Sequence, residues 1–109
     1  MAGFLSGGDW VCPSYRREYE FEAFVEAIAE IPGVSGVDMG FSPSISPREV
    51  VDRGELVRSY GLDIAMLMVN TWGEARWKFG TLTAPDPAIR QESIRLHKLQ
   101  LELAEALEV

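Results

Sequence analysis

Residues 18–31 carry apolar side chains at the spacing of one helical face, with glutamates on the opposite face. The apolar positions are Phe21, Phe24, Val25 and Ile28. Pro32 and Gly33 follow, and this pair is typical of a helix end. The pattern therefore predicts an amphipathic helix over residues 18–31.

Two later runs have the character of buried strands. Residues 34–41 are short and rich in β-prone side chains, with glycines and Ser42-Pro43 around them. Residues 62–69 are almost continuously hydrophobic. Strands that are apolar on both faces are typical of parallel sheets covered by helices. We expect both runs to be strands of one parallel sheet.

The helix between these strands has recognisable ends. Ser46 is a candidate N-cap, Pro47 fits the first turn, and Glu49 completes a Ser-x-x-Glu capping box. Its apolar stripe is interrupted by Gly54, and Gly61 lies where a left-handed C-terminal cap is expected. The stripe consists of Val50, Val51, Leu56, Val57 and Tyr60.

A third helix is predicted from Asp86, with Pro87 in its first turn, to about Leu107. Its inner side is expected to comprise Ile89, Leu96, Leu99, Leu103 and Leu107, broadened by Ile94 and Leu101.

With a first strand near residues 3–6, the order is strand and helix repeated three times. This alternation predicts an α/β fold with parallel strands in a single domain over residues 1–109. Doubly wound sheets and barrels both have this order. The sequence contains no Gly-x-Gly-x-x-Gly between a strand and a helix, and no Gly-x-x-x-x-Gly-Lys-Ser/Thr.

Composition narrows the possible partners and compartment. The 109 residues carry a formal charge of −7, which disfavours nucleic acid as a partner. No apolar run approaches the roughly 20 residues that span a bilayer. The one cysteine, Cys12, cannot form an intramolecular disulfide, so we expect a cytoplasmic protein. Cys12 is either a nucleophile or a small apolar residue, and His97 suits a solvated helix face.

The connection from Val69 to Asp86 is long for a strand-to-helix loop, and long loops in compact domains are often functional. It contains Trp72, Trp77 and Phe79 and leaves the carboxyl end of a parallel strand, where α/β folds bind ligands. Tryptophan offers a flat apolar surface and one N–H donor, which suits a sugar. Alternatively, these rings cover the end of the sheet or pack on a neighbouring subunit.

Residues 79–107 resemble a segment of the xylose isomerase-like TIM-barrel superfamily. Members often have Gly-Ser/Thr-Leu-Thr/Ser-x-Pro-Asp-Pro-x-x-Arg before the third helix, which typically ends in Ala-x-x-Leu-Gly. Here Glu108 stands in place of the last glycine. Residues 33–41 resemble the second strand, with Asp38 in place of the usual glutamate. Residues 60–70 resemble the third strand, and Gly8-Asp9 is similar to a Gly-Asp after the first.

The resemblance implies the first three βα units of a (βα)8 barrel from a sugar isomerase or epimerase. Complete members bind a divalent metal, of the Mn or Mg type, through residues on later strands. No catalytic residue or metal ligand therefore carries over to this chain. The ends of the first three strands contribute to the carbohydrate pocket instead. The matching positions are Trp10, Asp38, Asn70, Trp72 and Trp77.

Such barrels need about 250 residues, so three βα units leave sheet edges unpaired. We expect either a homo-oligomer or a second chain that completes the barrel. The leading function is the N-terminal segment of a sugar isomerase/epimerase-like enzyme. Alternatives are a non-catalytic assembly module, a relative of C-glycoside-cleaving carbohydrate lyases, and a free-standing α/β binding domain. Relatives that act on abasic DNA fit the acidic composition poorly.

Overall fold

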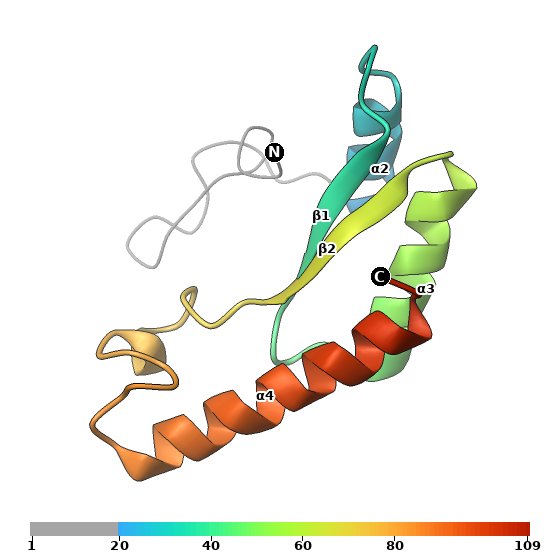
Figure 1. Ribbon diagram of the computed structural model, residues 1–109. Helices are drawn as coiled ribbons and strands as arrows, with labels where there is room; N and C mark the ends of the chain where they lie inside the picture. Colours follow the sequence, from blue (N-terminus) through green and yellow to red (C-terminus); the bar gives the residue numbers. More distant parts are fainter. Residues whose placement is uncertain (1–19) are drawn as a thin grey trace.

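The computed structural model describes residues 20–109. Three α-helices, two strands and one short 3-10 helix follow one another in the order α2 (Phe21–Ala29), β1 (Gly36–Phe41), α3 (Pro47–Ser59), β2 (Asp63–Val69), η1 (Ala75–Trp77) and α4 (Pro87–Ala106). The expected first strand, together with Trp10 and Cys12, lies outside the described residues. Figure 1 shows β1 and β2 side by side, with α4 running below them and ending beside α3.

The two strands pair in parallel, as the alternating pattern predicts. Gly36 and Val37 lie opposite Asp63 and Ile64, whereas Asp38 lies opposite Met66. One residue of β2, Ala65, is therefore extra, and the register shifts by one residue at this bulge. The described part of the chain is thus a mixed α/β structure with a two-stranded parallel sheet.

Local capping fixes the ends of α3. Ser46 Oγ accepts a hydrogen bond from Glu49 N at 3.2 Å, as the cap predicts. The reciprocal half of the capping box is not formed, because the Glu49 carboxylate accepts instead from Arg53 at 2.8 Å. Beyond the helix, Gly61 has the expected left-handed backbone, with φ of 76°. The first helix is shorter than predicted: its N-cap, Glu20, makes no side-chain capping bond.

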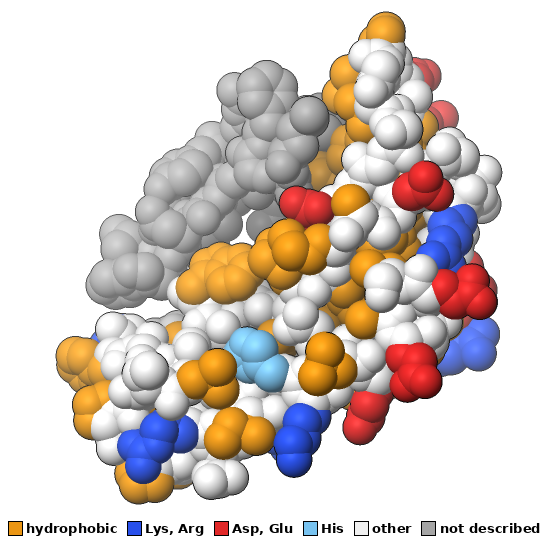
Figure 2. All heavy atoms as spheres, in the orientation of Figure 1, with side chains coloured by type: hydrophobic (Ala, Val, Ile, Leu, Met, Phe, Trp, Pro, Cys, Tyr) orange, Lys and Arg blue, Asp and Glu red, His pale blue; other side chains and the backbone are white. Residues whose placement is uncertain are grey.

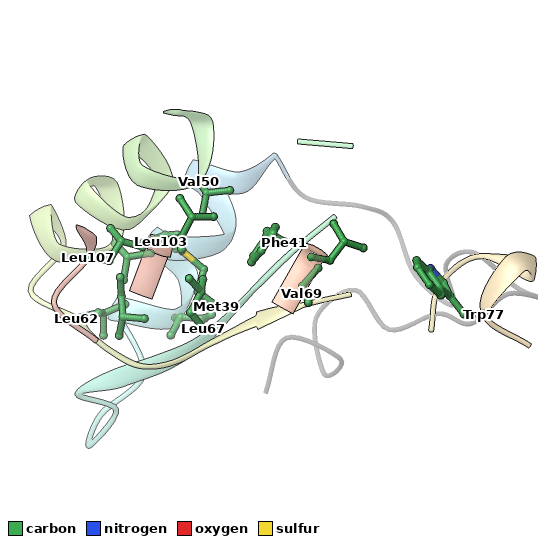
Figure 3. Close-up of a cluster of buried hydrophobic side chains, with 14 residues drawn as sticks. Met39, Phe41, Val50, Leu62, Leu67, Val69, Trp77, Leu103 and Leu107 are labelled. Carbon is green, nitrogen blue, oxygen red and sulfur yellow. The ribbon is translucent and has the colours of Figure 1, made fainter. Parts of the chain in front are cut away.

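The core lies between one face of the sheet and the helices (Figure 3). Gly54 of α3 lies where this packing is closest. A Cβ atom at Gly54 would come within 2.5 Å of Leu107 Cδ2 and 3.2 Å of Ile64 Cδ1. The glycine that interrupts the apolar stripe of α3 therefore lets the end of α4 and strand β2 approach the helix. Buried members of this core include Met39, Phe41, Val50, Val57, Leu67, Val69, Leu96 and Leu103.

The inner side of α4 is narrower than predicted. Ile94 and Leu101 were expected to broaden it, but they are 38% and 69% exposed. The side of α4 that meets the sheet is occupied by Leu96, Leu103 and the polar Gln100, whose Nε2 donates to Leu67 O at 2.8 Å. The contact with β2 is thus complete without the two flanking apolar residues.

The two faces of the sheet differ in cover. Met39 and Phe41 of β1 are buried, whereas Asp38 and Gly40, which alternate with them, are exposed. Across from Asp38, Met66 of β2 is 41% exposed. Because alternate residues of a strand point to opposite faces, the helices cover one face. Among residues 20–109, the opposite face is open at Asp38, Gly40 and Met66.

Candidate functional site

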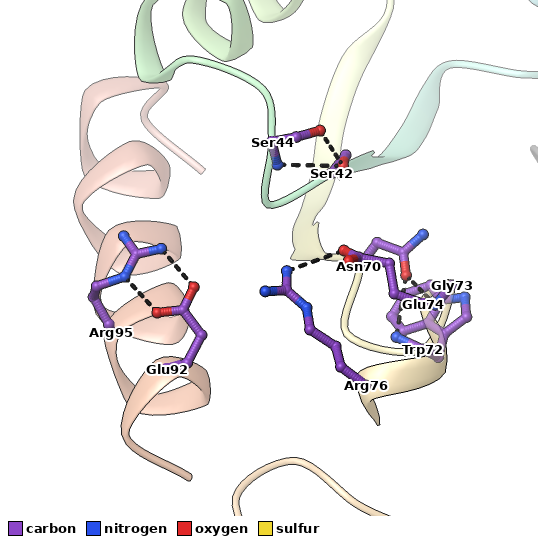
Figure 4. A network of polar contacts seen from close by, with 9 residues as sticks. All are labelled: Ser42, Ser44, Asn70, Trp72, Gly73, Glu74, Arg76, Glu92 and Arg95. Carbon is purple, nitrogen blue, oxygen red and sulfur yellow. Dashed lines mark hydrogen bonds and ion pairs between the residues drawn. The ribbon is translucent and has the colours of Figure 1, made fainter. Parts of the chain in front are cut away.

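The loop after β2 begins with a tight turn built by Asn70 (Figure 4). Asn70 Oδ1 accepts hydrogen bonds from Trp72 N at 3.1 Å and Gly73 N at 2.8 Å. A Cβ atom at Gly73 would lie only 2.9 Å from Asn70 Nδ2, so the turn needs glycine there. Asparagine side chains favour such turns because they can replace a backbone acceptor. The turn fixes the direction in which the chain leaves the sheet.

Trp72 is held by this turn directly after the carboxyl end of β2. Its side chain is largely in solvent, since the residue is 60% exposed. Large aromatic residues in small proteins are usually well buried on average. An exposed indole on a hydrogen-bonded turn is therefore a candidate contact surface. The structure brings Asn70 and Trp72 together, as two of the predicted site residues.

Trp77 has a different environment from Trp72. It lies at the end of η1 and is 4% exposed, so its ring is packed inside the molecule rather than facing solvent. The Arg76 guanidinium lies 4.6 Å from the centroid of the ring and also pairs with Glu74 at 3.1 Å. Trp77 Nε1 has no hydrogen-bond partner among the described residues. The two loop tryptophans thus do not form one exposed wall.

The distal half of the loop presents an aromatic ring that sequence reasoning did not select as a site residue. Phe79 is 73% exposed, with Lys78 Nζ 4.8 Å from its ring centroid. It borders an open hollow of about 260 Å³ that reaches Pro85 and Ile89. Its place in the aromatic loop was the only available signal in the sequence, because exposure depends on how the loop folds.

Arg90 fastens this distal half of the loop to the first turn of α4. Its Nη1 donates to Ala84 O at 2.6 Å and to Pro85 O at 2.8 Å. Asp86 Oδ1 caps the helix by accepting from Ala88 N at 2.8 Å. Both ends of the long connection are therefore anchored by side chains.

Asp38 is not at a strand end, contrary to the sequence-based expectation. Three further residues of β1 follow it, and it pairs with Met66 rather than with the end of β2. Asn70 is four residues beyond Met66, which corresponds to about 13 Å along a strand. Asp38 therefore lies on the open face of the sheet, away from the turn that holds Trp72. Trp10 lies outside the described residues.

No group of three or more His, Cys, Asp or Glu residues within 20–109 is arranged to hold a metal ion. His97, on α4, is half-buried, and its Nδ1 lies 2.7 Å from Ser93 O. The ring therefore donates Nδ1–H to a carbonyl of its own helix.

Glu92 and Tyr60, which lie outside the Asn70 turn, have shifted pKa values. Hydrogen bonds from Arg95 lower the pKa of Glu92, and the nearby Arg95 charge acts in the same direction. The pKa of Tyr60 is raised by desolvation and then by the negative charge of Glu22, whose Oε1 accepts from the phenol at 3.3 Å. The charge of Arg76 in the loop also lowers the pKa of Glu92, whereas the shift of Tyr60 marks a contact between the end of α3 and α2.

No family model, curated protein or solved structure matches this chain. The resemblance to the xylose isomerase-like superfamily therefore stays a prediction from residues 79–107 and the strand motifs. In the part of the chain that the structure describes, no helix is both long and apolar enough to cross a membrane.

Proposed function

We propose that this chain is the N-terminal part of a sugar isomerase/epimerase-like (βα)8 barrel, and that it contributes carbohydrate-contacting residues at the carboxyl end of its parallel sheet. The observation that carries this proposal is the exposed indole of Trp72, held next to the end of β2 by two hydrogen bonds to Asn70 Oδ1. In parallel α/β folds this end of the sheet is where ligands bind.

The chemistry of the turn suits a neutral sugar. The face of an indole is apolar and packs against the C–H groups of a pyranose or furanose ring. Asn70 Oδ1 is already used by the turn, whereas its Nδ2 makes no hydrogen bond with described residues and can donate to a hydroxyl. Because the turn is ordered before binding, little conformational entropy is lost when a sugar stacks on Trp72.

The catalytic step is assigned to strands beyond the three predicted βα units. In the complete barrel, a divalent metal of the Mn or Mg type would polarise the oxygens of a sugar carbonyl. We place the protein in the cytoplasm. A C-glycoside-cleaving lyase of the same barrel superfamily would use the same carbohydrate surface. The residues on the metal-binding strands would therefore determine which reaction is catalysed.

A second candidate function is that of an assembly module. It is favoured by the open face of the sheet at Asp38, Gly40 and Met66. Apolar strands with uncovered faces and unpaired edges tend to associate with further chain. A second polypeptide that supplies further parallel strands would extend the sheet at its edges and, by closing the barrel, cover this face. Native mass spectrometry of the protein from its own source would detect such a partner.

Sugar binding can be tested by NMR titration of the ¹⁵N-labelled chain with a panel of pentoses and hexoses. We expect amide shifts concentrated at Asn70, Trp72 and Gly73. Replacing Trp72 by alanine should weaken binding about tenfold or more, since stacking of a sugar-sized ring on an aromatic face is lost. Phe79→Ala is the matched control, because it removes another exposed aromatic ring from the same loop.

Equal losses in Trp72→Ala and Phe79→Ala would contradict a site centred on the Asn70 turn. If no sugar of the panel shifts the amide signals of this turn, the proposal that the isolated chain binds carbohydrate is refuted. If a second chain co-purifies in that case, the assembly role becomes the better account. Binding at Trp72 without a second chain would favour the carbohydrate role.

A further inference from the structure

The outer side of α4 carries a short seam of five residues at three- and four-residue spacing. We call Arg90, Ile94, Lys98, Leu101 and Glu105 the α4 seam. Residues at this spacing share one side of a helix. Leu101 is 69% exposed and Ile94 is 38% exposed, although the solvent side of a helix is normally polar. Figure 2 shows hydrophobic side chains over the part of the surface formed by α4.

The seam is self-complementary. Ile94 and Leu101 lie symmetrically about a point between His97 and Lys98, and Arg90 and Glu105 lie symmetrically about the same point. If a second α4 runs antiparallel across the seam, Ile94 faces Leu101 of the other copy. Arg90, whose Nη1 is held by Ala84 O and Pro85 O, then presents its remaining nitrogens to Glu105 of the other copy, and each contact occurs twice. In the antiparallel arrangement, apolar residues of one copy thus face apolar residues of the other, and the guanidinium cation of each copy faces an anion.

The opposite flank of α4 lacks this symmetry. It carries Glu92, Arg95 and Glu102, and the first two of these are paired with each other at 2.8 Å. This flank is complete in the monomer as an ordinary solvated surface. The contrast between the two flanks favours the seam as the contact surface.

We propose that the chain forms a two-fold symmetric dimer in which the α4 seam packs antiparallel against the same seam of a second copy. Isologous contacts of this kind require one self-complementary patch and close without open ends. Lys98 lies next to the two-fold axis, where its long side chain can extend to water while its methylene stem covers the apolar pairs. The seam uses neither Trp72 nor Asn70, so the dimer is independent of the carbohydrate proposal.

The seam is short, so we expect a weak, concentration-dependent dimer. Sedimentation velocity of the full chain, from micromolar to millimolar concentration, measures it directly. Leu101→Glu should raise the dissociation constant at least about tenfold, because an apolar contact is replaced by a charge at two places. Leu101 is exposed in the monomer, so this variant keeps its fold, which circular dichroism checks. Leu82→Glu is the matched control, since Leu82 is half exposed in the loop.

The charge pairs are tested separately. Glu105→Lys places a second cation opposite Arg90 and should weaken the dimer about threefold or more. Glu102→Lys makes the same change of net charge on the other flank of α4 and should leave the dimer unchanged. A weakening by both variants to the same extent would indicate a general charge effect and overturn the pairing of Arg90 with Glu105.

Orientation is tested by disulfide crosslinking in a Cys12→Ser background. Lys98→Cys lies next to the proposed axis and should crosslink on mild oxidation, whereas Gln91→Cys, which is exposed two turns from the axis and thus about 20 Å from its own copy, should not. A monomer at every concentration overturns the proposal, as does equal dimerisation of Leu101→Glu and Leu82→Glu. Crosslinking at Gln91→Cys but not at Lys98→Cys overturns it as well.

Discussion

Replacing Gly54 by alanine tests how closely α3, β2 and the end of α4 pack. In an exposed helix interior this change stabilises a protein by up to about 1 kcal/mol, because glycine is a poor helix former. At Gly54 the new Cβ would lie 2.5 Å from Leu107 Cδ2 and 3.2 Å from Ile64 Cδ1. Leu107 is 1% exposed, so its side chain can yield only by repacking within the core.

Overpacking of a buried site costs about 1–3 kcal/mol, which exceeds the gain in helix propensity. We therefore expect Gly54→Ala to lower the free energy of unfolding by roughly 1 kcal/mol. The sign should reverse once Leu107 is shortened. Leu107→Ala alone should cost about 2–5 kcal/mol, because it empties a buried site. In that background Gly54→Ala should stabilise by roughly 0.5–1 kcal/mol, since the methyl group occupies the vacated space.

The assay is urea unfolding of the four proteins of this cycle, followed by circular dichroism at one protein concentration. The expected coupling between the two substitutions is about 2 kcal/mol. A second cycle with Leu101→Ala is the control, because Leu101 is largely exposed and should not couple to Gly54. Two results would refute the close packing of Leu107 against Gly54. One is that Gly54→Ala stabilises the otherwise unchanged protein, and the other is that the two cycles give equal coupling energies.

Three further predictions concern single side chains. Ser46→Ala should lower the free energy of unfolding by about 1 kcal/mol, because Glu49 N loses its acceptor, whereas Ser46→Asp should keep it. Asn70→Ala should speed amide exchange at Trp72 and Gly73, and Asn70→Asp, which keeps the acceptor oxygen, should not; equal rates in both variants would contradict the turn. Arg95→Ala should raise the pKa of Glu92 in an NMR titration. Because the pKa of Glu92 is lowered in the folded protein, the ion pair stabilises the fold at any pH above the pKa of the unfolded chain. This stabilisation is lost as the pH falls through the pKa of the folded protein.

The ends of the elements could be predicted because capping is local. Ser46 and Asp86 each accept a hydrogen bond from the first turn of the helix that follows, and Gly61 adopts a left-handed backbone. These interactions involve residues within a few positions of one another, so the sequence contains all the information they need. Glu20 makes no side-chain cap, and α2 is the helix whose predicted start was too early.

Burial along α4 could not be predicted in the same way, because it depends on contacts between distant residues. Gly54 admits Leu107 to the core from more than fifty positions away. Gln100 bonds to Leu67 O on the side of α4 that meets the sheet. Helical periodicity alone assigned Ile94 and Leu101 to that side, because it counts apolar residues without knowing how much surface is available to cover them.

The candidate site shows the same limit. Trp72 and Trp77 occupy one loop and were predicted to act together, yet one is largely exposed and the other is buried. Their difference arises from the Asn70 turn and from the short η1 helix, neither of which changes the hydrophobic pattern. The position of the loop at the carboxyl end of a parallel strand was predictable. Which of its aromatic faces reaches solvent was not.

The hydrogen bond from Gln100 also bears on how the sheet could grow. Asn70 N donates to Phe41 O at 2.8 Å, and in a parallel ladder alternate residues of a strand bond to opposite neighbours. Leu67 O, three residues earlier, therefore points away from β1, toward the outer edge of β2. Gln100 Nε2 satisfies this carbonyl from α4. A strand added at that edge would have to replace the bond, whereas a second α4 packed on the seam leaves it intact. Association through the α4 seam consequently requires no rearrangement of the sheet.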